Sequence, residues 1–219
     1  MIELITFDFG AVLSQWPLLA KGVAVTLGLT AVAAVIGIAV GIACAWARVY
    51  GNTFLKVVVG AYVELVRNTP FIVQLFFVFF GLPSLGIKLN AETASIIAMV
   101  VNLGAYATEI IRAGIEGTSK GQIEAAQSLA LTPAQTFTRV VLPPALARIW
   151  PALTSQIIIV MLGSAVCGQI STEDLSFAAN LIQSRNFRAF EAYIIATLIY
   201  LVLAISVRKL MFMIAPKNG

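Results

Sequence analysis

The chain has 219 residues, of which 60% are hydrophobic and only 11% are charged, whereas roughly a quarter of the residues in soluble domains are charged. This composition excludes an ordinary soluble domain and indicates a protein of the membrane. The chain has no histidine, and its two cysteines, Cys44 and Cys167, lie in apolar runs, so we expect no metal site, no disulfide framework and no cofactor held by the chain.

Apolar runs long enough, or nearly so, to cross a membrane recur along the chain. A hydrocarbon core of roughly 30 Å takes about 20 helical residues, and the runs cover residues 23–46, 57–80, 93–107, 149–170 and 192–207. We therefore predict an all-α membrane protein, a single transmembrane domain over residues 1–219 with five transmembrane helices. A polar loop, residues 118–144, joins the third helix to the fourth.

The basic residues indicate how this bundle is oriented. Nine lysines and arginines flank the side that carries the loop and the carboxyl terminus, and four flank the other side. By the positive-inside rule, the loop and the carboxyl terminus face the cytoplasm and the amino terminus lies outside. This topology also accounts for the net charge of +4, so we expect no nucleic-acid partner.

Small residues in the first predicted span favour close packing. Gly37 and Gly41 lie four residues apart, a spacing that allows another helix to approach closely. We expect this helix to come from the same chain rather than from a second copy.

The second predicted span contains the most polar groups. Pro70 is expected to break the helix and to free a backbone carbonyl near residue 66, while Asn68 and Thr69 hydrogen-bond the loosened turn. Gln74 follows about one turn later. A broken polar segment inside a membrane helix is typical of a substrate path.

Two charges on this span, Glu64 and Arg67, lie three residues apart on one helical face. One interpretation places them on the substrate path. The other is a buried ion pair that only fixes helix packing. The residues alone leave both interpretations open.

Further polar groups follow in the third and fourth spans. Asn102, Tyr106 and Glu109 form a stripe on one face of the third span, which has to face protein or water. We expect Glu109 to act as a gate or an interhelical bond. In the fourth span Gly163 and Ser164 lie near the middle of the membrane and offer backbone and hydroxyl contacts.

The loop itself reads as two short helices. Ser119 with Gln122, and Thr132 with Gln135, have the spacing of a capping box, and Pro143 with Pro144 is expected to end the second helix. The first helix has Ile123, Ala126 and Leu129 near one face. Either a partner's groove or the chain's own bundle covers that face.

The loop resembles the EAA loop of permease subunits in bacterial ATP-binding cassette (ABC) importers. The matching residues are Glu124, Ala125, Ala126, Ala130, Val140, Leu142 and Pro143. The resemblance implies that this loop docks into a groove on the ATP-hydrolysing subunit and that these residues couple the two. The family has glycine at the place of Ala130, so either the first helix ends without a left-handed residue or the turn differs.

The second span resembles polar amino-acid permeases within that family. The match runs through Arg67, Thr69, Pro70, Val73, Gln74, Leu75, Phe76, Phe77, Gly81, Leu82 and Pro83, with Asn68 where glycine is common. Many such permeases carry Lys-Asp-Thr-Ser-Leu at residues 162–166, and this chain lacks the charged pair. We therefore favour a heterodimer with a second permease subunit over a homodimer.

The resemblance implies a permease subunit of an ATP-driven amino-acid importer in the bacterial cytoplasmic membrane. Its expected partners are a second permease subunit, two ATP-binding subunits, an external substrate-binding protein and an amino-acid substrate. The chain has no GxxxxGK[ST] phosphate loop, so ATP and Mg²⁺ belong to the partner and this chain is not itself an enzyme. The alternatives are an ion-coupled transporter or channel subunit, with Glu64 and Glu109 as coupling carboxylates, and a non-transporting scaffold.

Overall fold

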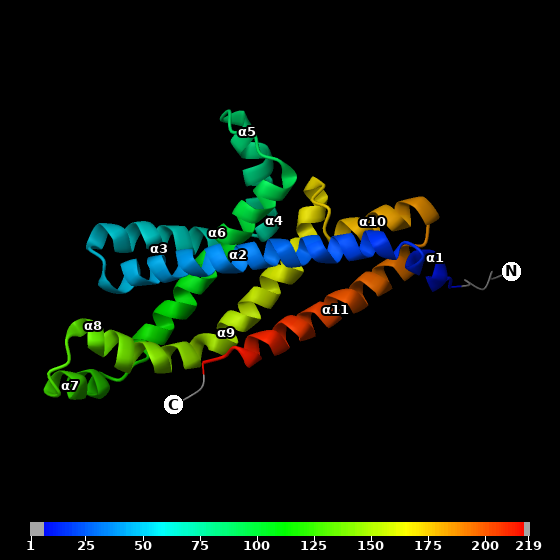
Figure 1. The fold of residues 1–219 in the computed structure, drawn as a ribbon. Helices are drawn as coiled ribbons and strands as arrows, with labels where there is room; N and C mark the ends of the chain where they lie inside the picture. Colours follow the sequence, from blue (N-terminus) through cyan, green and yellow to red (C-terminus); the bar gives the residue numbers. More distant parts are fainter. Residues whose placement is uncertain (1–6, 217–219) are drawn as a thin grey trace.

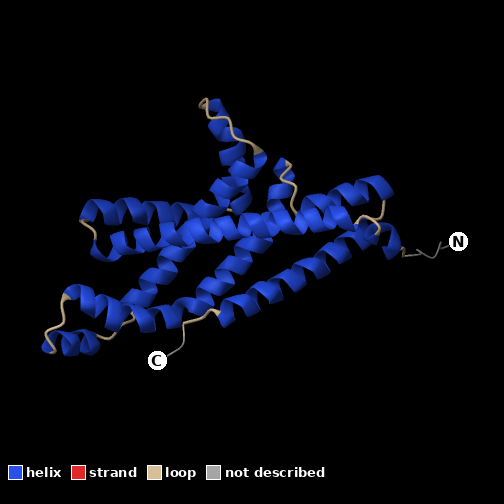
Figure 2. Cartoon of the chain, in the orientation of Figure 1, coloured by secondary structure: helices blue, strands red, loops and turns tan. Residues whose placement is uncertain are grey.

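A computed structural model describes residues 7–216, which fold into helices joined by short loops (Figure 1). Figure 2 shows no strand in this part of the chain. The elements are α1 (Phe9–Leu13), α2 (Trp16–Tyr50), α3 (Thr53–Arg67), α4 (Phe71–Phe76), η1 (Phe77–Gly81), α5 (Leu82–Ser84), α6 (Ala91–Glu116), α7 (Lys120–Ser128), α8 (Pro133–Thr136), η2 (Phe137–Val141), α9 (Leu142–Gly163), η3 (Ser164–Ile170), α10 (Leu175–Asn186) and α11 (Ala189–Met213). Lys217, one of the nine basic residues counted above, lies outside the described residues.

The predicted five-helix architecture is confirmed. Four helical runs are long and apolar enough to cross a membrane, namely α2, α6, η2 through η3, and α11. The fifth is a broken pair, in which α3 and the α4–α5 segment meet at an angle of 109°. In Figure 1, α3 runs back beside α2, and α5 stands away from the other helices. The first span begins at Trp16, earlier than predicted, because Pro17 fits the first turn of a helix.

The packing of α2 against α6 forms the centre of the bundle. A Cβ atom added to Gly41 would lie 2.6 Å from the Cβ of Ala107, and one on Gly37 would lie 3.0 Å from the Cβ of Leu103. The two helices therefore approach so closely that only glycine fits on α2. This confirms that the glycine pair serves packing within the chain.

The end of the bundle near the amino terminus is closed by α10 (Figure 1). One apolar face of this helix is buried: Leu175, Ala178, Ala179 and Ile182. Asp174 caps it by accepting a hydrogen bond from the Phe177 amide at 2.9 Å, and it also accepts one from the Tyr200 hydroxyl at 3.0 Å. Burial raises the pKa of the Asp174 carboxyl.

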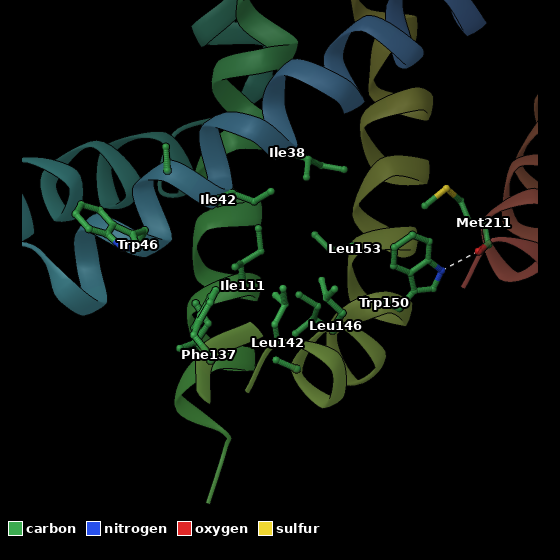
Figure 3. A pocket seen from close by; sticks show the side chains of 14 residues that line it. Ile38, Ile42, Trp46, Ile111, Phe137, Leu142, Leu146, Trp150, Leu153 and Met211 are labelled. Carbon is green, nitrogen blue, oxygen red and sulfur yellow. Dashed lines mark hydrogen bonds between the residues drawn. The ribbon is translucent and has the colours of Figure 1, made fainter. Parts of the chain in front are cut away.

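The opposite end contains an apolar hollow of about 630 Å³ between α2, α6, α9 and α11 (Figure 3). Ile42, Ile111 and Leu153 line it from three of these helices. At its edge, the Trp150 indole N–H donates to the Met211 carbonyl at 2.7 Å (Figure 3). This bond fixes the level of α9 relative to the end of α11.

We predict that Gly41→Ala destabilises the bundle by roughly 1–3 kcal/mol, the usual cost of overpacking. The added methyl group would meet the backbone and Cβ of Ala107, which have no flexible side chain that could move aside. Thermal unfolding of the purified chain in detergent measures the effect. Gly28→Ala in the same helix is the control, because a Cβ there has no neighbour within 4 Å. Equal melting temperatures for the two variants would contradict the close approach.

Candidate functional site

The break between α3 and α4 is held by side chains that replace the lost helical bonds. The Gln74 amide donates to the Val66 carbonyl at 2.7 Å and to the Thr69 carbonyl at 3.0 Å. The Asn68 amide donates to the Glu64 carbonyl, and the Thr69 hydroxyl to the Leu65 carbonyl. The predictions that Pro70 frees the carbonyl of residue 66, and that Asn68 and Thr69 bond the loosened turn, are confirmed.

Gln74 also joins the break to the next span. Its side-chain oxygen accepts a hydrogen bond from the Asn102 amide of α6 at 3.0 Å. Gln74 is partly buried, so this bond lies between helices rather than in solvent. A single side chain thus satisfies the broken backbone and holds α4 against α6.

A polar cavity of about 260 Å³ lies between α2, α3 and α6, next to the break. It brings together five of the residues predicted for the substrate path or gate: Glu64, Arg67, Asn68, Tyr106 and Glu109. Arg48 of α2 also lines it. The polar stripe on α6 therefore faces protein and this cavity, as predicted.

Glu64 and Arg67 do not form the buried ion pair that was one of the two interpretations. No ion pair joins them within the described residues, and both are exposed in the isolated chain. The Arg67 guanidinium instead lies 5.3 Å from the centre of the Tyr106 ring, a cation–π geometry. Glu64 and Arg67 share one helical face, but Arg67 packs against an aromatic ring of α6 instead of pairing with Glu64.

Glu109 forms the predicted interhelical bond. Its carboxylate lies 2.7 Å from Arg112 on the same helix and 3.7 Å from Arg48 on α2, and Arg112 also pairs with Glu116 at 2.6 Å. Arg48 reaches it across α3, where a Cβ on Gly60 would lie 2.4 Å from its Nη1 atom. The sequence analysis missed Arg48 as a site residue; its only signal was its position at the end of the first span.

The structure does not bring Gly163 and Ser164 to this cavity. Ser164 begins η3, is fully buried, and donates its hydroxyl to the Met161 carbonyl at 2.8 Å. Gly163 is partly buried beside it. A place on the substrate path stays a prediction for these two residues.

The loop of residues 118–144 presents α7 beyond the end of the bundle (Figure 1). Glu124 and Ala125 are exposed, whereas Ala126 is buried. Leu129 was expected on the same face as Ala126, but 76% of it is exposed, because the helix ends at Ser128 and the chain turns away. The exposed side of α7 is thus free to meet another subunit.

The turn after α7 uses the left-handed conformation. Ala130 has φ +54°, the Leu131 amide donates to the Ala126 carbonyl at 3.1 Å, and the Ala130 amide donates to the Gln127 carbonyl at 2.9 Å. These two bonds form a Schellman motif. The expectation that the helix could end without a left-handed residue is wrong, and alanine takes the position that suits glycine.

One predicted cap is present and the other is not. The Gln135 side chain accepts from the Thr132 amide at 2.9 Å, and the Thr132 hydroxyl accepts from the Gln135 amide at 3.3 Å, which confirms the second capping box. Ser119 makes no side-chain cap, because the Gln122 amide donates to the Ser119 carbonyl instead.

The predicted helix end at Pro143 and Pro144 is wrong. The π-helical η2 runs directly into α9, with the Leu142 amide donating to the Phe137 carbonyl. Both prolines fall in the first turn of α9, directly after the π-helical turn, and the helix continues through them. Among the remaining coupling residues, Val140 and Leu142 are partly buried and Pro143 is exposed.

We predict that Ala130→Gly stabilises the chain by up to about 1 kcal/mol, because left-handed backbone costs a non-glycine residue roughly 1–2 kcal/mol and glycine's chain entropy offsets part of the gain. Thermal unfolding measures it. Ala130→Val is the opposing variant and should lower the melting temperature. A lower melting temperature for the glycine variant would contradict the left-handed assignment.

We predict that Gln74→Leu destabilises the chain by about 2 kcal/mol, because it removes the 2.7 Å bond to the Val66 carbonyl and leaves only a long 3.4 Å bond from the Thr69 hydroxyl. Asn102→Leu should cost less, since the Gln74 amide keeps its bonds to the turn. If the joint exists, the double variant loses less than the sum of the two single losses. Strictly additive losses in a thermal unfolding cycle would show that the two side chains do not interact.

Comparisons with known proteins place this architecture. Residues 37–218 match the family described as "Binding-protein-dependent transport system inner membrane component". The chain is 36% identical to the probable glutamine ABC transporter permease protein GlnM of Bacillus subtilis, over 80% of this chain and 83% of that protein. It is 35% identical to the arginine transport system permease protein ArtQ of the same organism, over 90% of this chain and 91% of that protein.

Solved structures show the same fold. A crystal structure of an amino acid ABC transporter with histidines contains a chain that matches with a TM-score of 0.89 and 38% identity, over 95% of this chain and 98% of that one. A chain of the MetNI methionine ABC transporter in an inward-facing conformation matches with a TM-score of 0.70 and 21% identity, over 90% of this chain and 95% of that one.

Proposed function

Because the chain belongs to the family of inner membrane components of binding-protein-dependent transport systems, we propose that it is the permease subunit of an ATP-driven importer of amino acids. The observation that carries this proposal is that α6 connects two features. One is a cavity lined by both acidic and basic side chains, and the other is the loop with its exposed helix. α6 walls the cavity and leads directly into the loop that carries α7. Relatives named for glutamine and arginine transport support the substrate class.

The cavity has the charges that an amino acid requires. Arg48 and Arg67 line it with Glu64 and Glu109, so a carboxylate and an ammonium group each meet an opposite charge. Glu109 already pairs with arginines on two helices, which leaves Glu64 as the carboxylate free to receive the ammonium group. The ion pairs of Glu109 with two arginines also disfavour an ion-coupled transporter, since this carboxylate already has partners within the protein.

A second permease subunit completes the path. Glu64 and Arg67 are exposed in the isolated chain, although charges at this depth have to face protein or water. A partner on this face would enclose the cavity. The absence of the charged pair at residues 162–166 favours a heterodimer, in which the other subunit supplies those groups.

The loop couples transport to ATP hydrolysis in two partner subunits. α7 presents Glu124 and Ala125 outward, in the manner of a helix that enters a groove. ATP and Mg²⁺ bind to those subunits and not to this chain. The loop and the carboxyl terminus lie in the cytoplasm, and a substrate-binding protein delivers the amino acid at the outer end near α10.

We predict that Glu124→Lys abolishes ATP-driven amino-acid uptake by the reconstituted importer, because an exposed lysine would repel the groove that accepts the glutamate. Uptake into proteoliposomes containing ATP, and co-purification of the ATP-binding subunit, measure the effect. Lys56→Glu is the control, since it reverses an exposed charge at the start of α3, outside the loop. Wild-type uptake by the Glu124→Lys variant, or uptake driven by an ion gradient without ATP, would contradict the proposal.

A further inference from the structure

A groove between α9 and α11 contains charges that the transport path does not use. It consists of two adjoining hollows, of about 580 and 370 Å³, that share Arg208 and Phe212. Lys209 lines the first hollow, and Thr154, Ser155 and Ile159 line the second. We call it the α9–α11 groove.

The groove runs from the membrane boundary into the hydrocarbon. Arg208 lies nineteen residues beyond Ala189, the first residue of α11, which corresponds to about 28 Å along a helix and so to about the thickness of the hydrocarbon core. The bond from Trp150 to the Met211 carbonyl sets α9 at the same level. Ile159 lies nine residues further along α9, about 13 Å deeper. The groove therefore has a basic rim and an apolar interior.

The rim charges have no acidic partner within the described residues. No ion pair there involves Arg208 or Lys209, and the Arg208 guanidinium lies 5.8 Å from the centre of the Phe212 ring. Two adjacent cations at a membrane boundary attract anionic headgroups. A ring beneath one of them holds the guanidinium in place.

A buried hydroxyl in the groove also lacks a partner. Thr154 is 2% exposed, and its Oγ1 atom makes no hydrogen bond. Buried hydroxyls are normally hydrogen-bonded. The Oγ1 atom has almost no exposed surface, so an oxygen of a ligand would satisfy it once the Thr154 side chain turns toward the hollow that this residue lines. Ser155, next along the helix, lines the same hollow.

We propose that the α9–α11 groove binds one anionic phospholipid. Its phosphate lies between Arg208 and Lys209, an acyl chain lies along Ile159, and an ester oxygen accepts a hydrogen bond from the Thr154 hydroxyl when that side chain turns toward the groove. This combination of two cations, one buried donor and an apolar wall matches the order of groups along a phospholipid. The site is independent of the amino-acid path and of the α7 surface.

Native mass spectrometry of the delipidated full chain in detergent tests the proposal. Phosphatidylglycerol should bind more tightly than phosphatidylcholine with the same acyl chains. Arg208→Gln with Lys209→Gln should weaken phosphatidylglycerol binding by about 30-fold, from the loss of two charges near the surface. Lys56→Gln is the matched control and should leave it unchanged. Equal binding of the two lipids, or an unchanged affinity in the double variant, would overturn the proposal.

A second measurement identifies the occupant in the membrane. Benzoylphenylalanine incorporated at the exposed position 159 should crosslink to phospholipid on illumination of the assembled importer. A crosslink to another polypeptide would show that a subunit, and not a lipid, covers the groove. Binding of soluble glycerol phosphate as tight as that of the lipid would reduce the site to a phosphate site and equally refute a lipid groove.

Discussion

A backbone carbonyl that loses its amide partner inside a membrane needs another hydrogen-bond donor. In this protein the side chain that supplies the donor also positions the helices beside the polar cavity. Pro70 deprives the Val66 carbonyl of its helical partner, and the Gln74 side chain supplies the replacement. An unsatisfied carbonyl in hydrocarbon costs several kcal/mol, so the position of Gln74 is fixed by the break itself. Because the same side chain accepts from Asn102, the break also sets where α4 meets α6.

The loop is attached to the bundle by continuous helix on one side and by a tight turn on the other. η2 passes into α9 without interruption, so movement of α8 is carried into the fourth span. At the other attachment, a Cβ on Gly117 would lie 2.4 Å from the Nη1 atom of Arg148. The end of α6 and the start of α9 are thus in close contact where the loop begins. The chain turns after α7 at Ala130, which has a left-handed backbone conformation.

Local patterns in the sequence predicted the local parts of this structure. The apolar runs, the effect of Pro70 and the capping box at Thr132 each depend on residues a few positions apart, and all three are confirmed. The part played by Arg48 was not predictable in this way, because it depends on how closely α3 crosses α2 at Gly60. The prolines at 143 and 144 misled because the sequence does not reveal the π-helical turn that precedes them, through which η2 continues into α9.

The Glu64 carboxylate lacks the partner that its spacing in the sequence suggested. Spacing suggested Arg67 as its partner, but Arg67 lies against Tyr106, and Glu64 has no basic partner within the described residues. An uncompensated carboxylate in a membrane span is costly, and no group within the described residues pairs with this one. The proposed function supplies two partners for it, a substrate ammonium and a facing subunit.

The two walls of the cavity differ in stiffness, and this difference gives the proposed transport cycle its geometry. One wall is α6, unbroken from Ala91 to Glu116 and continuous with the start of the loop. The other is α3, which ends at the break before Pro70. The side-chain contacts that cross between α6 and its neighbours at this level include those from Gln74 to Asn102, from Arg67 to Tyr106 and from Arg48 to Glu109. Under the proposed function, a force on α7 would turn α6 as a rigid body against the broken wall, so the cavity would open by exchange of such side-chain contacts rather than by unfolding of a helix.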